Sequence, residues 1–284
     1  MKSVLVTGAN GQLGKCIHDA AESHEELWFY FADRAILDLD KPESVNSVFQ
    51  QHNFDYCINT AAYTNVEKAE SEKDAAFLTN AKGVKHLAEV CRENGTTLIH
   101  ISTDYVFDGK KMEPYVEEDL VNAISVYGAS KLKGEEYVKA ICEKYFIVRT
   151  SWLYSQYGHN FLNSMLRFAA EGRDLNITTE QLGTPTNAND LAGAVLSIIQ
   201  QNSTAYGLYH FSNKGSGTWY DFARAIFEYS GQLETVSLEK TEHYRTFAER
   251  PAYSILSKAK FSNTFNYPLV DWKESLKQLI ENHK

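Results

Sequence analysis

The chain has 284 residues, enough for one large domain or two closely joined ones. Hydrophobic residues make up 43% and charged residues 23%, proportions typical of a globular protein with a sizeable core. The net charge of -9 argues against a general surface for nucleic acid or anionic membrane, and the sequence contains neither a signal-peptide pattern nor an apolar run of membrane-spanning length. We therefore expect a cytoplasmic protein whose four cysteines are buried, reduced thiols.

The first predicted elements are a strand at residues 4–6, a glycine-rich turn at residues 7–14 (TGANGQLG) and a helix that follows the turn. In this context Gly8 permits a tight turn, Gly11 lets the backbone approach a pyrophosphate, and Gly14 allows helix and strand to pack closely. The helix N-terminus offers free N–H groups and a positive dipole end to phosphate. The turn therefore predicts a dinucleotide site, with a purely structural turn as the alternative.

A second strand is predicted at residues 27–31, and Asp33 and Arg34 follow it. At this place an acidic residue usually binds the adenosine ribose, whereas an arginine favours a 2′-phosphate. Because both residues occur side by side, the choice between NADH and NADPH stays open. Farther along the chain, Asp40 and Glu43 predict a capping box for the next helix.

The third strand is predicted at residues 56–59 and opens into residues 60–64 (TAAYT). Small side chains at the carboxyl end of a strand leave room for a ligand over the sheet edge, where doubly wound sheets bind their ligands. The apolar spacing that follows predicts one long helix over residues 77–91.

The fourth predicted strand, residues 97–101, runs into Thr103 and Asp104, and the next helix carries Tyr127 and Lys131. Tyr127 and Lys131 are four positions apart and share a helix face, and of the 17 tyrosines only Tyr127 has a lysine at this spacing. A phenol has an ordinary pKa of about 10, and a nearby ammonium group lowers it. We therefore expect Lys131 to acidify Tyr127 for general acid catalysis, with an incidental surface pair as the alternative.

A fifth strand at residues 145–148 completes an alternation of strands and helices. This alternation predicts an α/β fold with a doubly wound parallel sheet of the Rossmann type, forming a dinucleotide-binding domain over residues 1–150. We expect residues 151–284 to form a smaller mixed α/β substrate-binding lobe, partly interleaved with the first domain. The elements predicted in this second half are helices at 161–170, 190–200, 219–229 and 272–280, and a short strand at 207–212.

Together these segments resemble the extended short-chain dehydrogenase/reductase family, and the likeness covers nearly the whole chain. It rests on the glycine turn, Asn59-x-Ala61-Ala62, Ser102-Thr103-Asp104 and Tyr127-x-x-x-Lys131. Longer runs, together with Arg250-Pro251, resemble the members that reduce dTDP-linked keto sugars. These runs are residues 60–70, 102–107, 149–154 and 207–211.

The resemblance implies an oxidoreductase that uses NADPH or NADH to reduce the C4 ketone of dTDP-6-deoxy-L-lyxo-4-hexulose to dTDP-L-rhamnose for cell-surface polysaccharide synthesis. Catalysis would fall to Thr103, Tyr127 and Lys131. The cofactor contacts expected from the residues and the resemblance together are Gly8, Gly11, Gln12, Leu13, Asp33, Arg34, Asp38, Leu39, Ala61, Ala62, Tyr63, Thr64, Tyr127 and Lys131. The substrate contacts expected in the same way are Thr103, Asp104, Trp152 and Arg250.

Several of these residues have simpler alternative roles. Asp104 would cap the loop after its strand, Trp152 would be a core aromatic, and Arg250 would be a surface ion-pair partner. The aromatic residues at 219–229 span more than one helix face, so we expect most of them in the core, with one ring available to stack on a nucleotide base.

Departures from the family pattern bear on partners. Some members form a dimer linked by magnesium through glutamates that align with Cys16 and Asn189; neither is a good magnesium ligand. We therefore expect no metal and regard that dimer as doubtful, which leaves homodimerisation itself open. Tyr105 stands where related dehydratases carry a glutamate, so the acid/base pair for elimination of water is missing. Two alternatives remain: a non-catalytic NADP-binding regulatory subunit of the methionine adenosyltransferase type, and a sugar-nucleotide epimerase.

Overall fold

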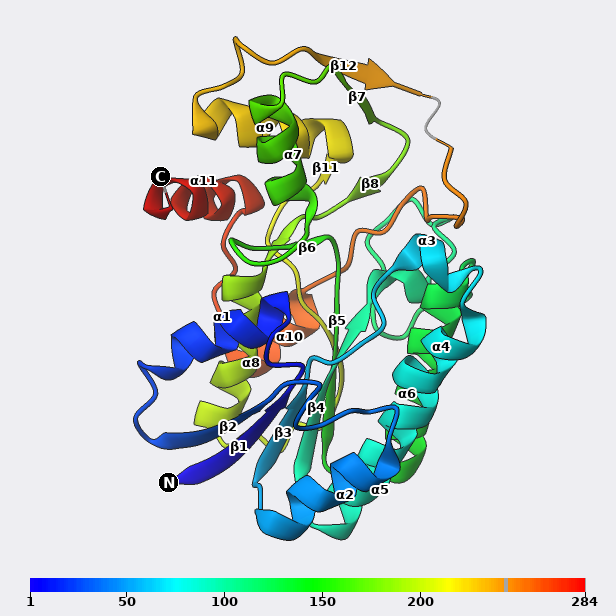
Figure 1. Ribbon diagram of the computed structural model, residues 1–284, viewed down its shortest axis with the longest axis vertical. Coiled ribbons are helices and arrows are strands. Elements are labelled where there is room, and N and C mark those ends of the chain that lie inside the picture. The colour runs from blue at the N-terminus through cyan, green and yellow to red at the C-terminus, as the bar shows by residue number, and fades with distance from the viewer. Residues whose placement is uncertain (243–244, 284) are drawn as a thin grey trace.

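A six-stranded parallel sheet forms the centre of the computed structural model, which describes residues 1–242 and 245–283. Its strands run in the order β10-β5-β4-β3-β1-β2 (Figure 1). They are β1 (Lys2–Thr7), β2 (Leu27–Ala32), β3 (Tyr56–Asn59), β4 (Thr97–Thr103), β5 (Tyr145–Thr150) and β10 (Gly207–His210). Every neighbouring pair in this sheet is parallel. The predicted doubly wound α/β fold is confirmed, and the sheet takes its sixth strand from the second half of the chain.

Helices cover both faces of the sheet, and each face buries its own apolar core. One face carries α1 (Gln12–Ala21), α8 (Ala188–Gln200) and α10 (Ala259–Phe265). The other face carries α2 (Pro42–Gln51), α5 (Val84–Glu93) and α6 (Val126–Ile141). Because helices cover both faces, the inner strands are apolar almost throughout, as in β3.

A smaller helical group lies beyond the carboxyl edge of the sheet (Figure 1). Its helices are α7 (Phe161–Ala170), α9 (Trp219–Ser230) and α11 (Trp272–Asn282). Short strand pairs join the group: β6 (Leu153–Tyr154) with β9 (Thr186–Asn187), β7 (Leu175–Thr178) with β12 (Leu238–Thr241), and β8 (Leu182–Gly183) with β11 (Gly217–Thr218). Within the described ranges, no helix combines the length and apolarity that crossing a membrane requires.

The long helix predicted over residues 77–91 is interrupted. The chain forms α4 (Lys73–Phe77), then a π-helical turn over Leu78–Gly83, and then α5. Inside this turn the Asn80 side chain accepts a hydrogen bond from Tyr63 N (2.8 Å) and donates to Ser130 Oγ on α6 (3.0 Å). The wider turn therefore coincides with the polar contacts of Asn80, which the spacing of apolar residues could not predict. π-Helical turns of this kind are frequent at functional sites.

The predicted capping box at Asp40 and Glu43 is wrong. Helix α2 begins at Pro42, with Lys41 in the N-cap position. Proline is favoured at the first helical position because it has no N–H group to satisfy, so the helix begins two residues after Asp40. Two further short helices are α3 (Val66–Ala69), which follows β3, and a 3-10 turn at Asp104–Val106, which follows β4.

Candidate cofactor and substrate cavity

A cavity of about 730 Å³ opens at the carboxyl edge of the sheet. It runs from the glycine turn after β1, past the ends of β3 and β4, to the loops of the smaller helical group. The chain crosses back over the sheet between β1 and β3, and in doubly wound folds ligands bind at such a switch point. The predicted contacts that line this cavity are Gly8, Gly11, Gln12, Leu13, Arg34, Asp38, Leu39, Ala61, Ala62, Thr64, Thr103, Asp104, Tyr127, Lys131, Trp152 and Arg250.

The glycine turn has the shape that a dinucleotide phosphate needs. Gly8 has a φ of 65°, and a Cβ there would lie 2.8 Å from the backbone of Ala61. A Cβ on Gly14 would lie 2.5 Å from the Gly8 carbonyl oxygen. Gly11 precedes α1 and has no side chain that could cap the helix, so it leaves the first-turn N–H groups available as donors where Gly11, Gln12 and Leu13 line the cavity. These residues fit a bound diphosphate.

Two predicted cofactor contacts, Asp33 and Tyr63, are missing from the described residues that line the cavity. The Tyr63 hydroxyl donates to Glu72 Oε2 at 2.6 Å, away from its neighbours Ala62 and Thr64, which do line the wall. Gln12 lines the cavity as predicted, but its Oε1 accepts hydrogen bonds from Ser155 Oγ and Asn160 Nδ2. Sequence position alone did not indicate which way these side chains turn.

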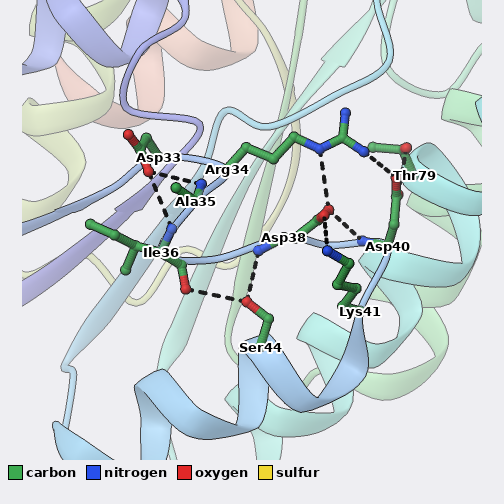
Figure 2. A network of polar contacts seen from close by, with 9 residues as sticks. All are labelled: Asp33, Arg34, Ala35, Ile36, Asp38, Asp40, Lys41, Ser44 and Thr79. Atoms are coloured by element: carbon green, nitrogen blue, oxygen red, sulfur yellow. Dashed lines mark hydrogen bonds and ion pairs between the residues drawn. The ribbon is translucent and has the colours of Figure 1, made fainter.

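At the end of the cavity beyond β2, charged side chains form a compact network (Figure 2). Asp33 accepts hydrogen bonds from its own turn and from Asn10, whereas Arg34 lines the cavity. The Arg34 guanidinium lies 3.4 Å from Asp38 and 2.7 Å from Asp40. The sequence presented Asp33 and Arg34 as equal candidates, and the fold brings only the arginine to the cavity wall.

The predicted catalytic side chains meet above the end of β4. Ser125 caps α6 by accepting a hydrogen bond from Gly128 N (3.2 Å), which fixes the first turn of the helix that carries Tyr127. A Cβ on Gly128 would lie only 2.1 Å from the Tyr105 carbonyl oxygen, so the helix packs directly on the turn after β4. Thr103, the last residue of β4, and Tyr127 both line the cavity and are joined by a side-chain hydrogen bond.

The expectation that Lys131 acidifies Tyr127 is wrong for this structure. Burial raises the pKa of Tyr127 to about 12, although the neighbouring Thr103 hydroxyl opposes this shift. The Lys131 ammonium group donates to the Ile101 carbonyl oxygen at 2.7 Å, and burial lowers its pKa to about 8. Helical spacing correctly predicts a shared face, but it does not report the carbonyl group that holds the amine or the loss of water around the phenol.

Asp104 is buried at the same end of the cavity. Its Oδ1 accepts a hydrogen bond from Thr103 Oγ1 at 3.0 Å. Burial raises the pKa of Asp104 to about 7, against the opposing effect of hydrogen bonds from Ser254 and Thr103. The carboxyl group therefore keeps its proton to a higher pH than an ordinary aspartate does.

Trp152 closes the far wall in a strained conformation. Its φ of 45° is rare for a bulky residue, and such outliers concentrate at functional sites. Its ring stacks on Trp219 with centroids 3.7 Å apart, and Trp219 also lines the cavity. Trp219 belongs to the aromatic group at residues 219–229 that was expected mostly in the core, and it begins the helix that Thr218 and Asp221 cap with a capping box. Lining residues that the sequence analysis missed include Asn10, Thr79, Gly158, His159 and Asn160.

Arg250 reaches the cavity from the C-terminal half. Its Nη2 donates to Glu67 Oε1 on α3 at 2.7 Å, and Glu67 Oε2 accepts hydrogen bonds from the backbone N–H groups of Phe247 and Ala248. The glutamate thereby ties the segment before Pro251 to α3, at the wall formed by its neighbour Val66. Arg250 therefore lines the cavity and also forms an ion pair with Glu67, the partner role that was its alternative, while its contact with a substrate stays a prediction.

Comparison with known proteins identifies relatives over the whole length of the chain. The family model described as "RmlD substrate binding domain" matches residues 1–284. The dTDP-4-dehydrorhamnose reductase of Sinorhizobium fredii is 40% identical over 286 residues, covering 98% of this chain and 96% of the relative. The enzyme of the same name from Aggregatibacter actinomycetemcomitans is 36% identical, with 98% of each chain covered.

A solved structure agrees with this result. The dTDP-4-dehydrorhamnose reductase of Bacillus anthracis, crystallised in complex with NADP, superimposes with a TM-score of 0.93 at 38% identity and with 99% of each chain covered. The predicted resemblance to proteins that reduce dTDP-linked keto sugars is confirmed. The chain therefore belongs to the RmlD substrate-binding-domain family, and the relatives named above are dTDP-4-dehydrorhamnose reductases.

Proposed function

We propose that this protein is an NADPH- or NADH-dependent oxidoreductase that reduces the C4 ketone of dTDP-6-deoxy-L-lyxo-4-hexulose to dTDP-L-rhamnose. One observation carries the proposal: Thr103, Tyr127 and Lys131 line the same cavity as the glycine turn. A proton donor thus shares one space with a cradle for a dinucleotide. The names of the relatives favour this activity over the regulatory-subunit and epimerase alternatives.

Tyr127 supplies the proton of the reaction. A bound nicotinamide provides the hydride, and the ketone oxygen then develops negative charge that must be neutralised. With a pKa raised to about 12, Tyr127 holds its proton throughout the physiological pH range. Its hydroxyl can therefore donate to the developing alkoxide, which is a stronger base than a phenolate. Thr103, beside Tyr127 on the cavity wall, would orient the ketone oxygen of the substrate.

Lys131 acts as a fixed cation beside this site. An ammonium group has three donors, and the Ile101 carbonyl accepts one of them at 2.7 Å. We assign the others to the nicotinamide ribose.

The remaining contacts divide along the cavity. Gly8, Gly11, Gln12 and Leu13 would hold the diphosphate, Arg34, Asp38 and Leu39 the adenosine, and Ala61, Ala62 and Thr64 the adjoining wall. Asp104, Trp152 and Arg250 would hold the sugar nucleotide, with the guanidinium suited to its diphosphate. On this division, residues 1–150 bind the cofactor and residues 151–284 supply much of the substrate wall.

We also propose that the protein works in the cytoplasm, on the support of four free, buried cysteines, and without a magnesium-linked dimer. Cys16 is buried on α1 with its pKa raised to about 12 by burial. Asn189 on α8 donates to Gln156 Oε1 and Asn187 Oδ1. Molar mass by light scattering, with and without a chelator, tests this: chelator-dependent dissociation would contradict it.

The test of function is a coupled measurement of cofactor and product. Purified protein, NADPH or NADH, and the keto sugar are mixed, and nicotinamide oxidation is followed while the product is identified by NMR. We expect one dTDP-L-rhamnose for each nicotinamide oxidised. Dinucleotide binding without turnover would indicate a regulatory subunit, whereas tightly retained NAD and an epimerised product would indicate an epimerase.

A further inference from the structure

The carboxylate of Asp33, which could select NADH, already accepts hydrogen bonds from other groups of the protein. Asp33 Oδ1 accepts hydrogen bonds from Ala35 N (2.9 Å) and Ile36 N (3.2 Å), and its Oδ2 accepts one from Asn10 Nδ2 (2.9 Å). An acidic residue at the end of the second strand normally binds the 2′-hydroxyl of the adenosine ribose. Here it stabilises the turn instead, as Figure 2 shows for its backbone partners.

Arg34 is the side chain of this pair that reaches the cavity, and it is 76% exposed. Its Nη2 lies 2.7 Å from Asp40 Oδ2, and its Nε lies 3.4 Å from Asp38 Oδ1 (Figure 2). Exposed ion pairs of this kind contribute little to stability because water screens them. The guanidinium is therefore held near the adenosine end of the cavity without being locked there.

Both carboxylates keep other partners if the guanidinium moves. Asp38 Oδ1 accepts a hydrogen bond from Asp40 N (3.1 Å), and Lys41 Nζ lies 3.5 Å from Asp38 Oδ2. Asp40 Oδ1 accepts a hydrogen bond from Thr79 Oγ1 at 2.6 Å. Releasing Arg34 therefore leaves neither carboxylate without a donor, and the movement costs little.

We propose that Arg34 makes this protein prefer NADPH, by exchanging Asp38 and Asp40 for the 2′-phosphate of the cofactor. This inference rests on the proposed function, because it takes the adenosine to lie at this end of the cavity. A planar guanidinium matches phosphate with two parallel hydrogen bonds. Asp40, the nearer carboxylate, competes with the phosphate for the same donor, so it limits the preference.

Equilibrium binding tests this without turnover. Isothermal titration calorimetry on the full-length protein compares ADP-ribose with and without a phosphate on the adenosine 2′-hydroxyl. Hydrogen bonds to charged groups correspond to about 10- to 100-fold in affinity, so we expect the phosphorylated ligand to bind at least 10-fold more tightly. Arg34→Gln should reduce this ratio to near one, because it weakens binding of the phosphorylated ligand far more than binding of unphosphorylated ADP-ribose.

Two further variants sharpen the result. Lys41→Gln removes the same charge from the same network, but Lys41 is not among the described residues that line the cavity, so the affinity ratio should persist. Asp40→Asn should increase the ratio several-fold, because it removes the competing carboxylate. Circular dichroism melting of each variant shows that the fold is retained.

Several outcomes would overturn the inference. They are equal affinity of the wild-type protein for both ligands, an equal loss of preference in Arg34→Gln and Lys41→Gln, and failure of both ligands to bind. The last outcome would also remove the dinucleotide assignment. By contrast, a clear preference for the 2′-phosphate in a protein that does not turn over the keto sugar would contradict the proposed function alone.

Discussion

The two ends of the cavity are built in different ways. At the chemistry end, Thr103 is 5% and Lys131 3% exposed, and both belong to regular elements of the central domain. At the adenosine end, the decisive side chain is the 76% exposed Arg34 on a loop, held by ion pairs at the surface. Proton transfer requires a donor fixed to within fractions of an ångström, whereas discrimination between two cofactors requires only a charge that can move.

A buried ion pair fixes the chemistry end. Glu135 lies one turn after Lys131 on α6 and accepts hydrogen bonds from Arg149 of β5 at 2.8 and 2.7 Å. Ser102 of β4 also donates to Glu135, at 2.6 Å. Because all these groups are buried, the network ties the helix that carries the proton donor to the two strands beneath it.

The largest effect is expected from Tyr127→Phe. Loss of the proton donor should lower kcat about 10²- to 10⁴-fold, with the dissociation constant for NADPH nearly unchanged, as measured by steady-state kinetics and calorimetry. Tyr137→Phe is the matched control, because Tyr137 lies on the same helix and its ring contacts Lys85 and Lys133. Equal losses in both variants would show that the helix, rather than the phenol, is being tested.

Glu135→Gln should cost about 3–5 kcal/mol in the free energy of unfolding, because it leaves Arg149 as an uncompensated buried charge. Denaturant unfolding measures the change. Glu136→Gln on the same helix removes a partner that is 52% exposed and paired with Lys133, so it should cost less than about 1 kcal/mol. Similar values for the two variants would contradict the idea that the buried pair holds the chemistry end.

Asp104→Asn should change how stability depends on pH. The carboxyl of an unfolded chain has a pKa of about 3.9, and burial raises that of Asp104 to about 7. The stabilisation by its protonated form is therefore fully present below about pH 4 and is lost as the pH rises through 7. Relative to wild type, the variant should gain up to about 4 kcal/mol in the free energy of unfolding between pH 4 and 8.

Asp108→Asn is the control for the sign of this effect. The backbone N–H of Lys110 lowers the pKa of Asp108, so that carboxylate stabilises the protein above its unfolded pKa. Its removal should therefore make the variant lose stability relative to wild type only as the pH rises toward about 4, the ordinary pKa of an aspartate, and the difference between the two proteins should stay constant from pH 4 to 8. Parallel slopes for the two variants, measured by thermal unfolding across this range, would contradict the assignment of a raised pKa to Asp104.

The sequence predicts the sheet well because its signals are local. Strand, glycine turn and helix follow one another in each unit, and the register of Tyr127 and Lys131 on one helix face follows from their spacing alone. The sequence does not predict the direction of a side chain when a residue far away in the chain binds it. The Ile101 carbonyl oxygen accepts a hydrogen bond from Lys131, and Asn10 donates one to Asp33. For the same reason the sequence did not indicate which ring of the aromatic group at 219–229 reaches the cavity, since Trp219 of α9 stacks on Trp152, far away in the chain.

Within one cavity, proton donation depends on Tyr127 at one end and cofactor selection depends on Arg34 at the other. The most direct measurement is kcat/KM for NADPH in the wild type, Tyr127→Phe, Arg34→Gln and the double variant. Since Tyr127 pairs with Thr103 and Arg34 with Asp38 and Asp40, the two losses should multiply to within about 2-fold. A loss in the double variant no larger than that of Tyr127→Phe alone would contradict the account.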